Sequence, residues 1–237
     1  IIRELTGGLY YGKPKKRWET KAGRKGVDTM LYTEKEIERI MRVGFELARS
    51  RRKKLTSVDK ANVLESSRLW RDVATELGKE YPDVELEHQL VDSCAMLLIT
   101  QPTHFDVMVM ENTFGDILSD EGAVLSASLG MLPSASLAGL PGLDSKGKPR
   151  KIRGLYEPSH GTAPDIVGTG KANPIGTILS AAFMLQYSFG LTEEANAVNA
   201  AVDAVISAGH RAADIAERGA EFSTTEHITE LIIDQLA

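Results

Sequence analysis

Two carboxylates in the segment ENTFGDILSDE, Asp116 and Asp120, are four residues apart. On a helix this spacing places both side chains on one face, with Cβ atoms about 5–6 Å apart. Carboxylate oxygens are the ligands that Mg²⁺ and Mn²⁺ prefer. An isolated pair at this spacing is usually a solvated helix face, but the flanking Gly115 and Gly122 allow close approach of backbone or ligand. The segment therefore predicts a metal site on a helix.

Lys60 and Asn62 directly follow a short apolar strand that we predict over Leu55–Val58. Loops at strand ends are where α/β proteins place their ligands. A single lysine in a loop is most often a plain surface residue. A divalent cation nearby, however, disfavours the ammonium form and makes the neutral amine available as a base. Lys60 is therefore a candidate general base if the metal site lies beside it.

Arg3 and Tyr10 lie at the front of the chain, in RELTGGLY. An arginine can bind a carboxylate through two parallel hydrogen bonds, and a tyrosine can donate a proton to a carbanion or enolate, although both residue types also serve structural roles. Asp92 ends the predicted strand VELEHQLVD. It is a candidate third carboxylate for the metal or, equally, the cap of the following helix.

A second group of candidates lies in the loop HGTAPD, residues 160–165. Its backbone N–H groups and imidazole are suited to hold an adenosine, and Asn173 lies just beyond it. Asp165 favours NAD over NADP, because a carboxylate accepts hydrogen bonds from a ribose 2'-hydroxyl and repels a 2'-phosphate. The later segment GTGKANPIG does not match G-x-G-x-x-G, so an ordinary Rossmann dinucleotide site is not indicated.

The composition is that of a globular protein. The chain has 237 residues, 42% of them hydrophobic and 26% charged, with a net charge of -5, so it can bury a core and is not expected to bind nucleic acid. Its single cysteine, Cys94, excludes an internal disulfide and fits a reducing compartment such as the cytoplasm. No apolar run approaches the ~20 residues that span a bilayer. The chain opens with IIREL and not with Met, which predicts truncation or processing, so an organellar targeting peptide remains open.

Short strands alternate with amphipathic helices in the first half of the chain, which predicts a layered α/β protein. A capping box from Thr33 to Glu36 marks one helix start, and Ser223 with Glu226 marks the start of the last helix. A polar Pro/Gly/Lys loop is expected over 139–153. We expect a domain boundary near Ser126, which gives two parts, residues 1–125 and 126–237. The other expected elements are strands over Val84–Val91 and Phe105–Met110 and helices over Pro174–Phe189 and Glu193–Ala208.

Taken together, these motifs resemble the isocitrate/isopropylmalate dehydrogenase family of β-decarboxylating dehydrogenases. RELTGGLYYG, SVDKANVLESSRLWR, ENTFGDILSDE, SASLGMLPSASL and EPSHGTAPDI stand in the family's order, a more specific signal than any single motif. RELTGG and KANVLESSRLW look like the isopropylmalate branch. The resemblance implies the family's two-domain α/β fold. It also implies oxidative decarboxylation of 3-isopropylmalate to 2-oxoisocaproate with NAD reduction, in leucine biosynthesis. A relative acting on isocitrate, homoisocitrate or tartrate is the alternative within the class.

The resemblance also implies a role for each candidate residue. Arg3 would bind the malate carboxylate, Tyr10 would protonate the enol, and Lys60 would be the general base. Asp92, Asp116 and Asp120 would hold Mg²⁺ or Mn²⁺, with Asp92 also near the substrate. Asn62 and Val63 would face the nicotinamide and the isopropyl group. The residues implied for the NAD adenosine are His160, Gly161, Thr162, Ala163, Asp165 and Asn173.

Two further expectations follow from the resemblance. Lys60 and Asp92 would serve the active site of a partner subunit, so a homodimer is required, and VDTMLYT, residues 27–33, would contribute to an intersubunit sheet. Family members also carry an additional N-terminal segment of about 100 residues. Without it the nucleotide-binding domain would be incomplete, with unpaired strands and exposed apolar surface. The chain alone is then expected to be unstable or an inactive dimerising fragment.

Overall fold

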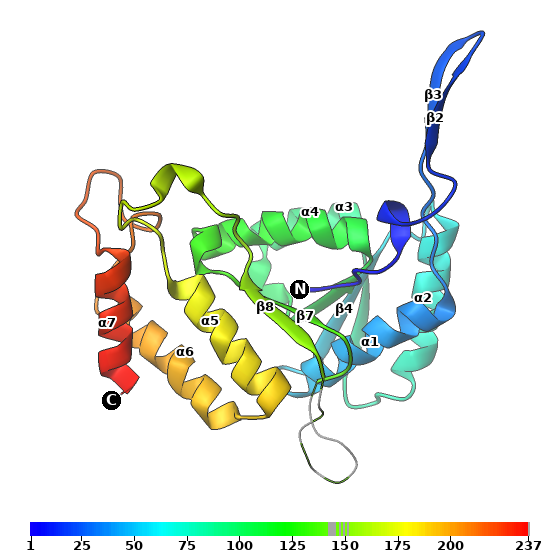
Figure 1. Ribbon diagram of the computed structural model, residues 1–237. Helices are drawn as coiled ribbons and strands as arrows, with labels where there is room; N and C mark the ends of the chain where they lie inside the picture. The colour runs from blue at the N-terminus through cyan, green and yellow to red at the C-terminus, as the bar shows by residue number, and fades with distance from the viewer. Residues whose placement is uncertain (142–145, 147, 149, 151, 237) are drawn as a thin grey trace. The chain divides into compact units, whose positions relative to one another are not determined.

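The computed structural model describes residues 1–141, 146, 148, 150 and 152–236 (Figure 1). Contacts within the chain divide it into two compact units, Ile1–Gly122 and Ala123–Ala237. The division falls close to the boundary expected near Ser126. Most of the polar loop expected over 139–153 lies outside the described residues.

The first unit is built on a parallel sheet with the strand order β1-β6-β4-β5. Apolar side chains alternate along its strands, so both faces are covered. Val107 and Val109 pack with helices α1 and α2 on one face, whereas Met108 and Met110 pack with α3 and α4 on the other. The strands are β1 (Ile2–Arg3), β4 (Lys54–Asp59), β5 (Glu85–Leu90) and β6 (Val107–Met110), and the helices are α1 (Glu34–Arg49), α2 (Glu65–Gly78), α3 (Val91–Thr100) and α4 (Asn112–Ala123).

Several local predictions are confirmed in this unit. The backbone N–H of Thr33 donates to Glu36 at 2.8 Å, which completes the predicted capping box at the start of α1. Cys94 is fully buried in the core beneath α3, and desolvation raises the pKa of its thiol to about 12. Asp116 and Asp120 both lie on α4, as their spacing predicts.

The basic segment before α1 is rich in glycine and lysine, which predicts a loop as far as Gly26, and this prediction was wrong. Its residues form an antiparallel hairpin of β2 (Lys16–Thr20) and β3 (Gly23–Val27), which extends from the unit as a thin arm (Figure 1). Residues 28–33 are not in a strand and have no sheet partner within the described residues, and the contribution of residues 27–33 to an intersubunit sheet stays a prediction. Tyr32 packs edge-on against Trp70 at 5.6 Å between ring centroids and Met30 packs against the same core, whereas Leu31 is exposed.

Asp92 also differs from its prediction, since it lies in the first turn of α3 and not at the end of a strand. A 3-10 turn, η1 (Gly8–Tyr10), follows β1, and a second, η2 (Pro102–His104), precedes β6.

The second unit contains a two-stranded antiparallel sheet, β7 (Pro133–Leu137) with β8 (Gly154–Pro158), against which α5 packs. Three helices, α5 (Ile175–Met184), α6 (Thr192–Ser207) and α7 (Thr225–Leu236), form its core, and a π turn, η6 (Leu185–Phe189), extends α5. The cap of α7 is one residue later than predicted, because the hydroxyl of Thr224, not of Ser223, accepts the N–H of His227 at 3.3 Å. The remaining 3-10 turns are η3 (Val124–Ser126), η4 (Leu129–Met131) and η5 (Pro164–Ile166).

Candidate active site

The candidate residues of the first unit lie at one edge of the parallel sheet. Arg3 ends β1, Asn112 follows β6, Lys60 follows β4 and Asp92 follows β5. The strands of this sheet all run in the same direction, so their carboxyl ends lie at the same edge. This edge is where α/β proteins bind ligands.

Arg3, Tyr10 and Asp116 form one cluster at this edge. The guanidinium of Arg3 lies 2.6 Å from the carboxylate of Asp116 and donates twice to Oδ1 of Asn112, at 3.0 and 2.8 Å. The hydroxyl of Tyr10 donates to the other oxygen of Asp116 at 2.6 Å. The hydrogen bond from Tyr10 and the charge of Arg3 hold the pKa of Asp116 below its usual value, and the same hydrogen bond raises the pKa of Tyr10. Tyr10 is therefore protonated at neutral pH.

Gly115 makes this cluster possible. A Cβ at position 115 would lie 2.5 Å from Cγ of Arg3, so only glycine allows the arginine side chain to cross α4. Asn112 fixes the other side of the arginine, since its Nδ2 donates to the carbonyl of Gly7 at 3.1 Å. Sequence reasoning did not single out Asn112. Its position directly after a buried strand, like that of Lys60 after β4, was the available signal.

Lys60 and Asp92 form a second cluster, with 2.6 Å between Nζ and Oδ1. This hydrogen bond lowers the pKa of Asp92. The turn that carries Lys60 is held by buried Asp59, whose carboxylate accepts the N–H of Ala61 at 2.9 Å and pairs with Arg71 at 2.9 Å. Asn62 and Val63 continue this turn and are exposed. Their side chains are therefore accessible to a ligand.

The structure does not bring the three predicted metal carboxylates together. Among the described residues, no three His, Cys, Asp or Glu side chains are placed to hold a metal ion. Asp116 and exposed Asp120 share α4, whereas Asp92 pairs with Lys60. The α4 pair offers the hard oxygen donors that suit Mg²⁺ or Mn²⁺, but a complete site needs a further ligand.

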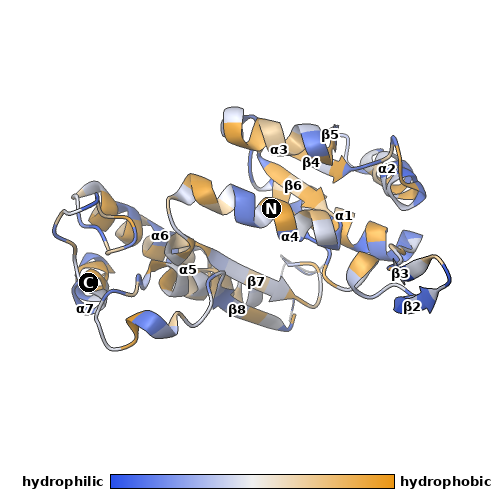
Figure 2. Cartoon of the chain, turned by 90° about the horizontal axis from the view of Figure 1, so that it is seen from above, coloured by the Kyte–Doolittle hydropathy of each residue, from blue (hydrophilic) through white to orange (hydrophobic). Residues whose placement is uncertain are grey.

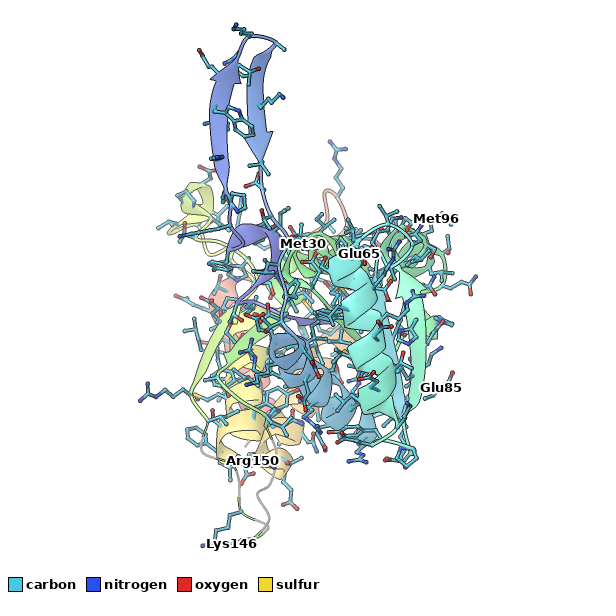
Figure 3. All side chains as sticks on the ribbon, turned by 90° about the vertical axis from the view of Figure 1, so that its right-hand side faces the viewer. Met30, Glu65, Glu85, Met96, Lys146 and Arg150 are labelled. Atoms are coloured by element: carbon cyan, nitrogen blue, oxygen red, sulfur yellow. The ribbon has the colours of Figure 1, made fainter. Side chains whose placement is uncertain are left out.

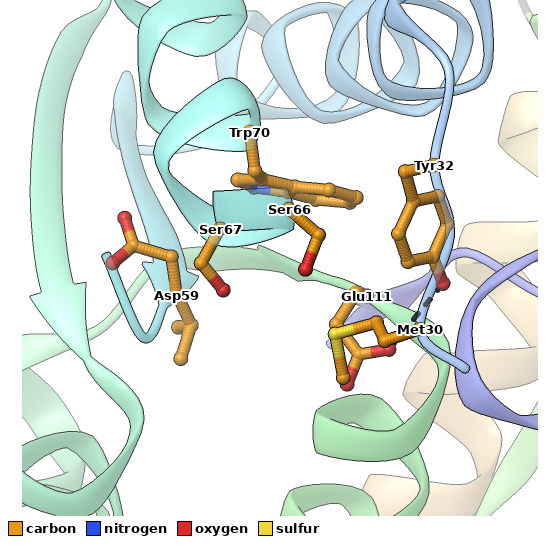
Figure 4. Close-up of a pocket in the computed structure, with 8 residues that line it drawn as sticks. Met30, Tyr32, Asp59, Ser66, Ser67, Trp70 and Glu111 are labelled. Carbon is orange, nitrogen blue, oxygen red and sulfur yellow. Dashed lines mark hydrogen bonds between the residues drawn. The ribbon is translucent and has the colours of Figure 1, made fainter. Parts of the chain in front are cut away.

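A narrow crevice lies between the sheet edge and α2 (Figure 4). It is too narrow to hold a water molecule. Glu111 lines it and caps α4, accepting the N–H of Thr113 at 3.0 Å and of Phe114 at 2.7 Å. Burial raises the pKa of Glu111. Glu111 thus stabilises the start of α4, and the crevice that it lines is not a ligand pocket. Its other lining residues are Met30, Tyr32, Val58, Asp59, Ser66, Ser67 and Trp70.

The predicted nucleotide residues of the second unit lie in an exposed loop after β8. The imidazole of His160 contacts the carbonyl of Gly161 at 2.9 Å. The backbone N–H groups of Gly161, Thr162 and Ala163 donate no hydrogen bond within the described residues, so they are available to a ligand. Asp165 is exposed in the 3-10 turn that follows.

Asn173 differs from the other nucleotide candidates because it is buried. Its side chain accepts the N–H of Ile175 at 3.0 Å and donates to Asp214 at 3.2 Å. Both ends of the amide are therefore occupied within the second unit. Sequence reasoning missed Asp214, because a contact between residues 41 positions apart leaves no local pattern.

Within the described residues, no helix has the length and apolar character needed to cross a membrane.

Comparison with known proteins identifies the family. The model of the isocitrate/isopropylmalate dehydrogenase family matches residues 1–232. Proteins named 3-isopropylmalate dehydrogenase from Dehalococcoides mccartyi strain 195, Bacillus subtilis strain 168 and Shouchella clausii are 63%, 57% and 55% identical, over 92%, 97% and 100% of this chain. The chain spans 59%, 60% and 62% of their lengths.

Solved structures agree with the predicted fold. The isocitrate dehydrogenase from Methylococcus capsulatus matches with a TM-score of 0.81 and 36% identity, over 99% of this chain and 66% of that one. A β-decarboxylating dehydrogenase from Thermococcus kodakarensis in its apo form matches with a TM-score of 0.77 and 35% identity, over 94% and 60%. The α/β fold that the resemblance implies is thereby confirmed, and the chain belongs to the isocitrate/isopropylmalate dehydrogenase family.

Proposed function

We propose that this chain provides active-site residues of an enzyme that oxidises and decarboxylates 3-isopropylmalate, with NAD and Mg²⁺ or Mn²⁺. Its support is the family membership together with three relatives of that name at 55–63% identity. The match to the isocitrate dehydrogenase structure is at a lower identity of 36%, so isopropylmalate is preferred to isocitrate, homoisocitrate or tartrate. The product is 2-oxoisocaproate, an intermediate of leucine biosynthesis.

The observation that carries the proposal is the pair of clusters at the carboxyl edge of the sheet. One cluster holds a cation and a proton donor, Arg3 and Tyr10, around the carboxylate of Asp116. The other holds an amine beside a carboxylate, Lys60 and Asp92. Oxidative decarboxylation of a 2-hydroxy acid with two carboxylates needs a cation that binds a carboxylate, a base that takes the hydroxyl proton and a proton donor for the carbon that loses CO₂.

The residues act in sequence on the substrate. Arg3 binds a malate carboxylate, which replaces Asp116 as its partner. Lys60 takes the proton of the 2-hydroxyl as the hydride leaves carbon 2, and CO₂ then leaves carbon 3. Tyr10 donates its proton to carbon 3 of the resulting enolate, whose oxygen becomes the carbonyl oxygen of the 2-oxo acid. When bound, NAD accepts the hydride, and the metal ion acts as a Lewis acid on the substrate's hydroxyl and carboxylate oxygens.

Asp116 and Asp120 would hold the metal ion from α4, with Asp92 of a second copy as the further ligand and Lys60 of that second copy, which lies beside its Asp92, as the base. This split explains why the three carboxylates do not meet within the described residues. Val63 would then contact the isopropyl group and Asn62 the nicotinamide. The adenosine of NAD would bind the loop of His160, Gly161, Thr162, Ala163 and Asp165, with Asn173 behind it.

Two surfaces of the first unit support a homodimer. Every residue of β2 and β3 except Thr20 and Val27 is exposed, and an isolated two-stranded hairpin is only marginally stable. On α3, Met96 and Ile99 are 66% and 63% exposed, and Ile117 on α4 is 61% exposed. Figure 2 colours much of α3 as hydrophobic, and Figure 3 shows Met96 at the surface. Apolar side chains gathered in this way mark protein interfaces.

The direct test is NADH formation with NAD, Mn²⁺ and 3-isopropylmalate, with isocitrate and tartrate in parallel, measured on the complete enzyme that contains this chain and on the purified chain alone. From the complete enzyme we expect turnover selective for isopropylmalate that is lost when the metal is chelated and restored by added Mn²⁺. Preferred turnover of isocitrate or tartrate would assign the chain to another branch of the family. No turnover by a folded, dimeric sample would indicate a dimerising fragment.

A further inference from the structure

The amide of Asn173 has one defined orientation. Ile175 presents an N–H to it at 3.0 Å, which requires the amide oxygen on that side. The amide nitrogen then faces Asp214, 3.2 Å from each carboxylate oxygen. Because the partners on the two sides are a donor and an acceptor, rotating the amide by half a turn would break both contacts.

Asp214 also joins a third segment to this arrangement. The hydroxyl of Ser128 donates to its carboxylate and accepts the N–H of Gly130 at 3.0 Å. A Cβ at position 130 would lie 2.5 Å from the Asp214 carboxylate and 2.9 Å from Cβ of Asn173, so the approach requires glycine. The carboxylate therefore ties η4 to the start of α5.

The same turn adjoins the loop of His160. Leu132, the residue after η4, accepts the N–H of Ser159 at 3.0 Å, directly before His160. α5 packs on both β7 and β8. Asp214 is thus linked through η4 to the loop that we assign to adenosine, since it contacts Ser128 before this turn and Leu132 after the turn contacts Ser159.

We propose that Asp214 is a positioning residue of the adenosine site, which acts through the side chain of Asn173 and does not touch the nucleotide. The inference rests on the proposed NAD function. Asp214 has no ion pair within the described part of the chain, and its contacts are the neutral donors Ser128 and Asn173. Its role is to fix the backbone at Asn173 and the first turn of α5 beside the His160 loop.

The test compares Asp214→Ala, Asp214→Asn and Asn173→Ala with the double variant Asp214→Ala/Asn173→Ala in the complete enzyme. Asp203→Ala is the matched control, since Asp203 is exposed on α6 and its side chain makes no hydrogen bond within the described residues. Calorimetry measures the dissociation constant of NAD. Steady-state kinetics give kcat and separate KM values for NAD and isopropylmalate, and thermal melting checks that each variant is folded.

For Asp214→Ala we expect a dissociation constant for NAD raised about tenfold, equivalent to about 1.4 kcal/mol. The kcat and the KM for isopropylmalate should stay unchanged. Asp214→Asn should recover most of the affinity, because its amide oxygen still accepts from Asn173. In the Asn173→Ala background, Asp214→Ala should add less than about twofold, as expected for residues that act together.

Unchanged NAD affinity in Asp214→Ala, or fully additive effects in the double variant, would overturn the positioning role. The role would also be overturned if Asp214→Asn bound NAD as weakly as Asp214→Ala, because the charge of Asp214 and not its hydrogen bond would then determine the NAD affinity. A wild-type enzyme that binds no NAD would refute the proposed function as well, and is recognised before any variant is made.

Discussion

Lys60 and Asp92 lie 2.6 Å apart across the ends of the neighbouring strands β4 and β5. Each group is the other's partner within this chain, and the pair is separate from the Arg3, Tyr10 and Asp116 cluster. The hydrogen bond from Lys60 lowers the pKa of Asp92, which keeps its carboxylate ionised at neutral pH. Lys60 must therefore lose this partner, or share it with a metal ion, before it can act as a base.

Replacing Lys60 with alanine should reduce the rate of hydride transfer by about 10²–10⁴-fold, the usual contribution of a general base. NAD binding should be nearly unchanged, because the proposed adenosine loop is in the other unit. Single-turnover NADH formation and NAD titration measure the two effects. Lys35→Ala is the control, since Lys35 is exposed on α1 without a partner in the described residues. Retained turnover in Lys60→Ala would remove Lys60 from the mechanism.

Replacing Gly115 with alanine should raise the KM for isopropylmalate about tenfold or more. The new Cβ would collide with the Arg3 side chain at 2.5 Å and displace its guanidinium from the substrate position. Thermal stability should fall little, because alanine favours the helix over glycine by about 1 kcal/mol and offsets part of the strain.

Steady-state kinetics and melting curves test this prediction. Gly122→Ala is the matched control, because its Cβ would meet only side-chain ends, Cδ1 of Ile1 at 3.3 Å and Cδ2 of Leu98 at 3.6 Å. An unchanged KM in Gly115→Ala would show that Arg3 is not held against α4 for substrate binding.

Ile99→Glu should convert the proposed homodimer into monomers and abolish activity, because a carboxylate would be buried in the apolar contact of α3. Light scattering coupled to size-exclusion chromatography measures the mass. Ile233→Glu on α7, where the side chain is similarly exposed at 58%, should leave the dimer intact. A dimeric Ile99→Glu enzyme would place the interface elsewhere.

Local signals in the sequence predicted much of the fold. The capping box gave the start of α1 at Thr33, and apolar strands gave β4, β5 and β6 to within two residues of their ends. The hairpin was missed because most of its residues are charged or glycine and exposed on both faces, so it lacks the alternation that marks a half-buried strand. The apolar residues after it indicated a strand, and of these Met30 and Tyr32 pack in the core around Trp70, whereas Leu31 is exposed.

The site was predictable as a set of residues and not as a set of contacts. Strand ends and motifs singled out Arg3, Lys60 and Asp116, since these features are local. The hydrogen bond from Tyr10 to Asp116 spans 106 positions and the contact of Asn173 with Asp214 spans 41. Such contacts depend on tertiary packing, which no spacing in the sequence specifies.

Asp106 should make stability depend on pH. Its side chain is fully buried directly before β6 and accepts Nε of Arg51 at 2.9 Å and the N–H of Arg52 at 2.8 Å. Burial by itself raises the pKa of Asp106, but these hydrogen bonds outweigh it and hold the pKa below its usual value. The folded protein therefore binds fewer protons here than the unfolded chain. The resulting stability is complete above the unfolded pKa of about 3.9 and is lost as the pH falls through the lower folded value.

Asp106→Asn should consequently lower the free energy of unfolding by about 1–3 kcal/mol at pH 7, since an amide cannot accept both donors equally. The difference from wild type should begin to shrink as the pH falls below about 4, where the carboxyl becomes protonated in the unfolded chain, and it should vanish only below the lower pKa of the folded protein. Urea unfolding at pH 7, 5 and 3.5 measures this trend, with Asp203→Asn as the exposed control. A difference that stays constant down to pH 3.5 would mean that packing and not ionisation of Asp106 stabilises the junction of Arg51 and Arg52 with β6.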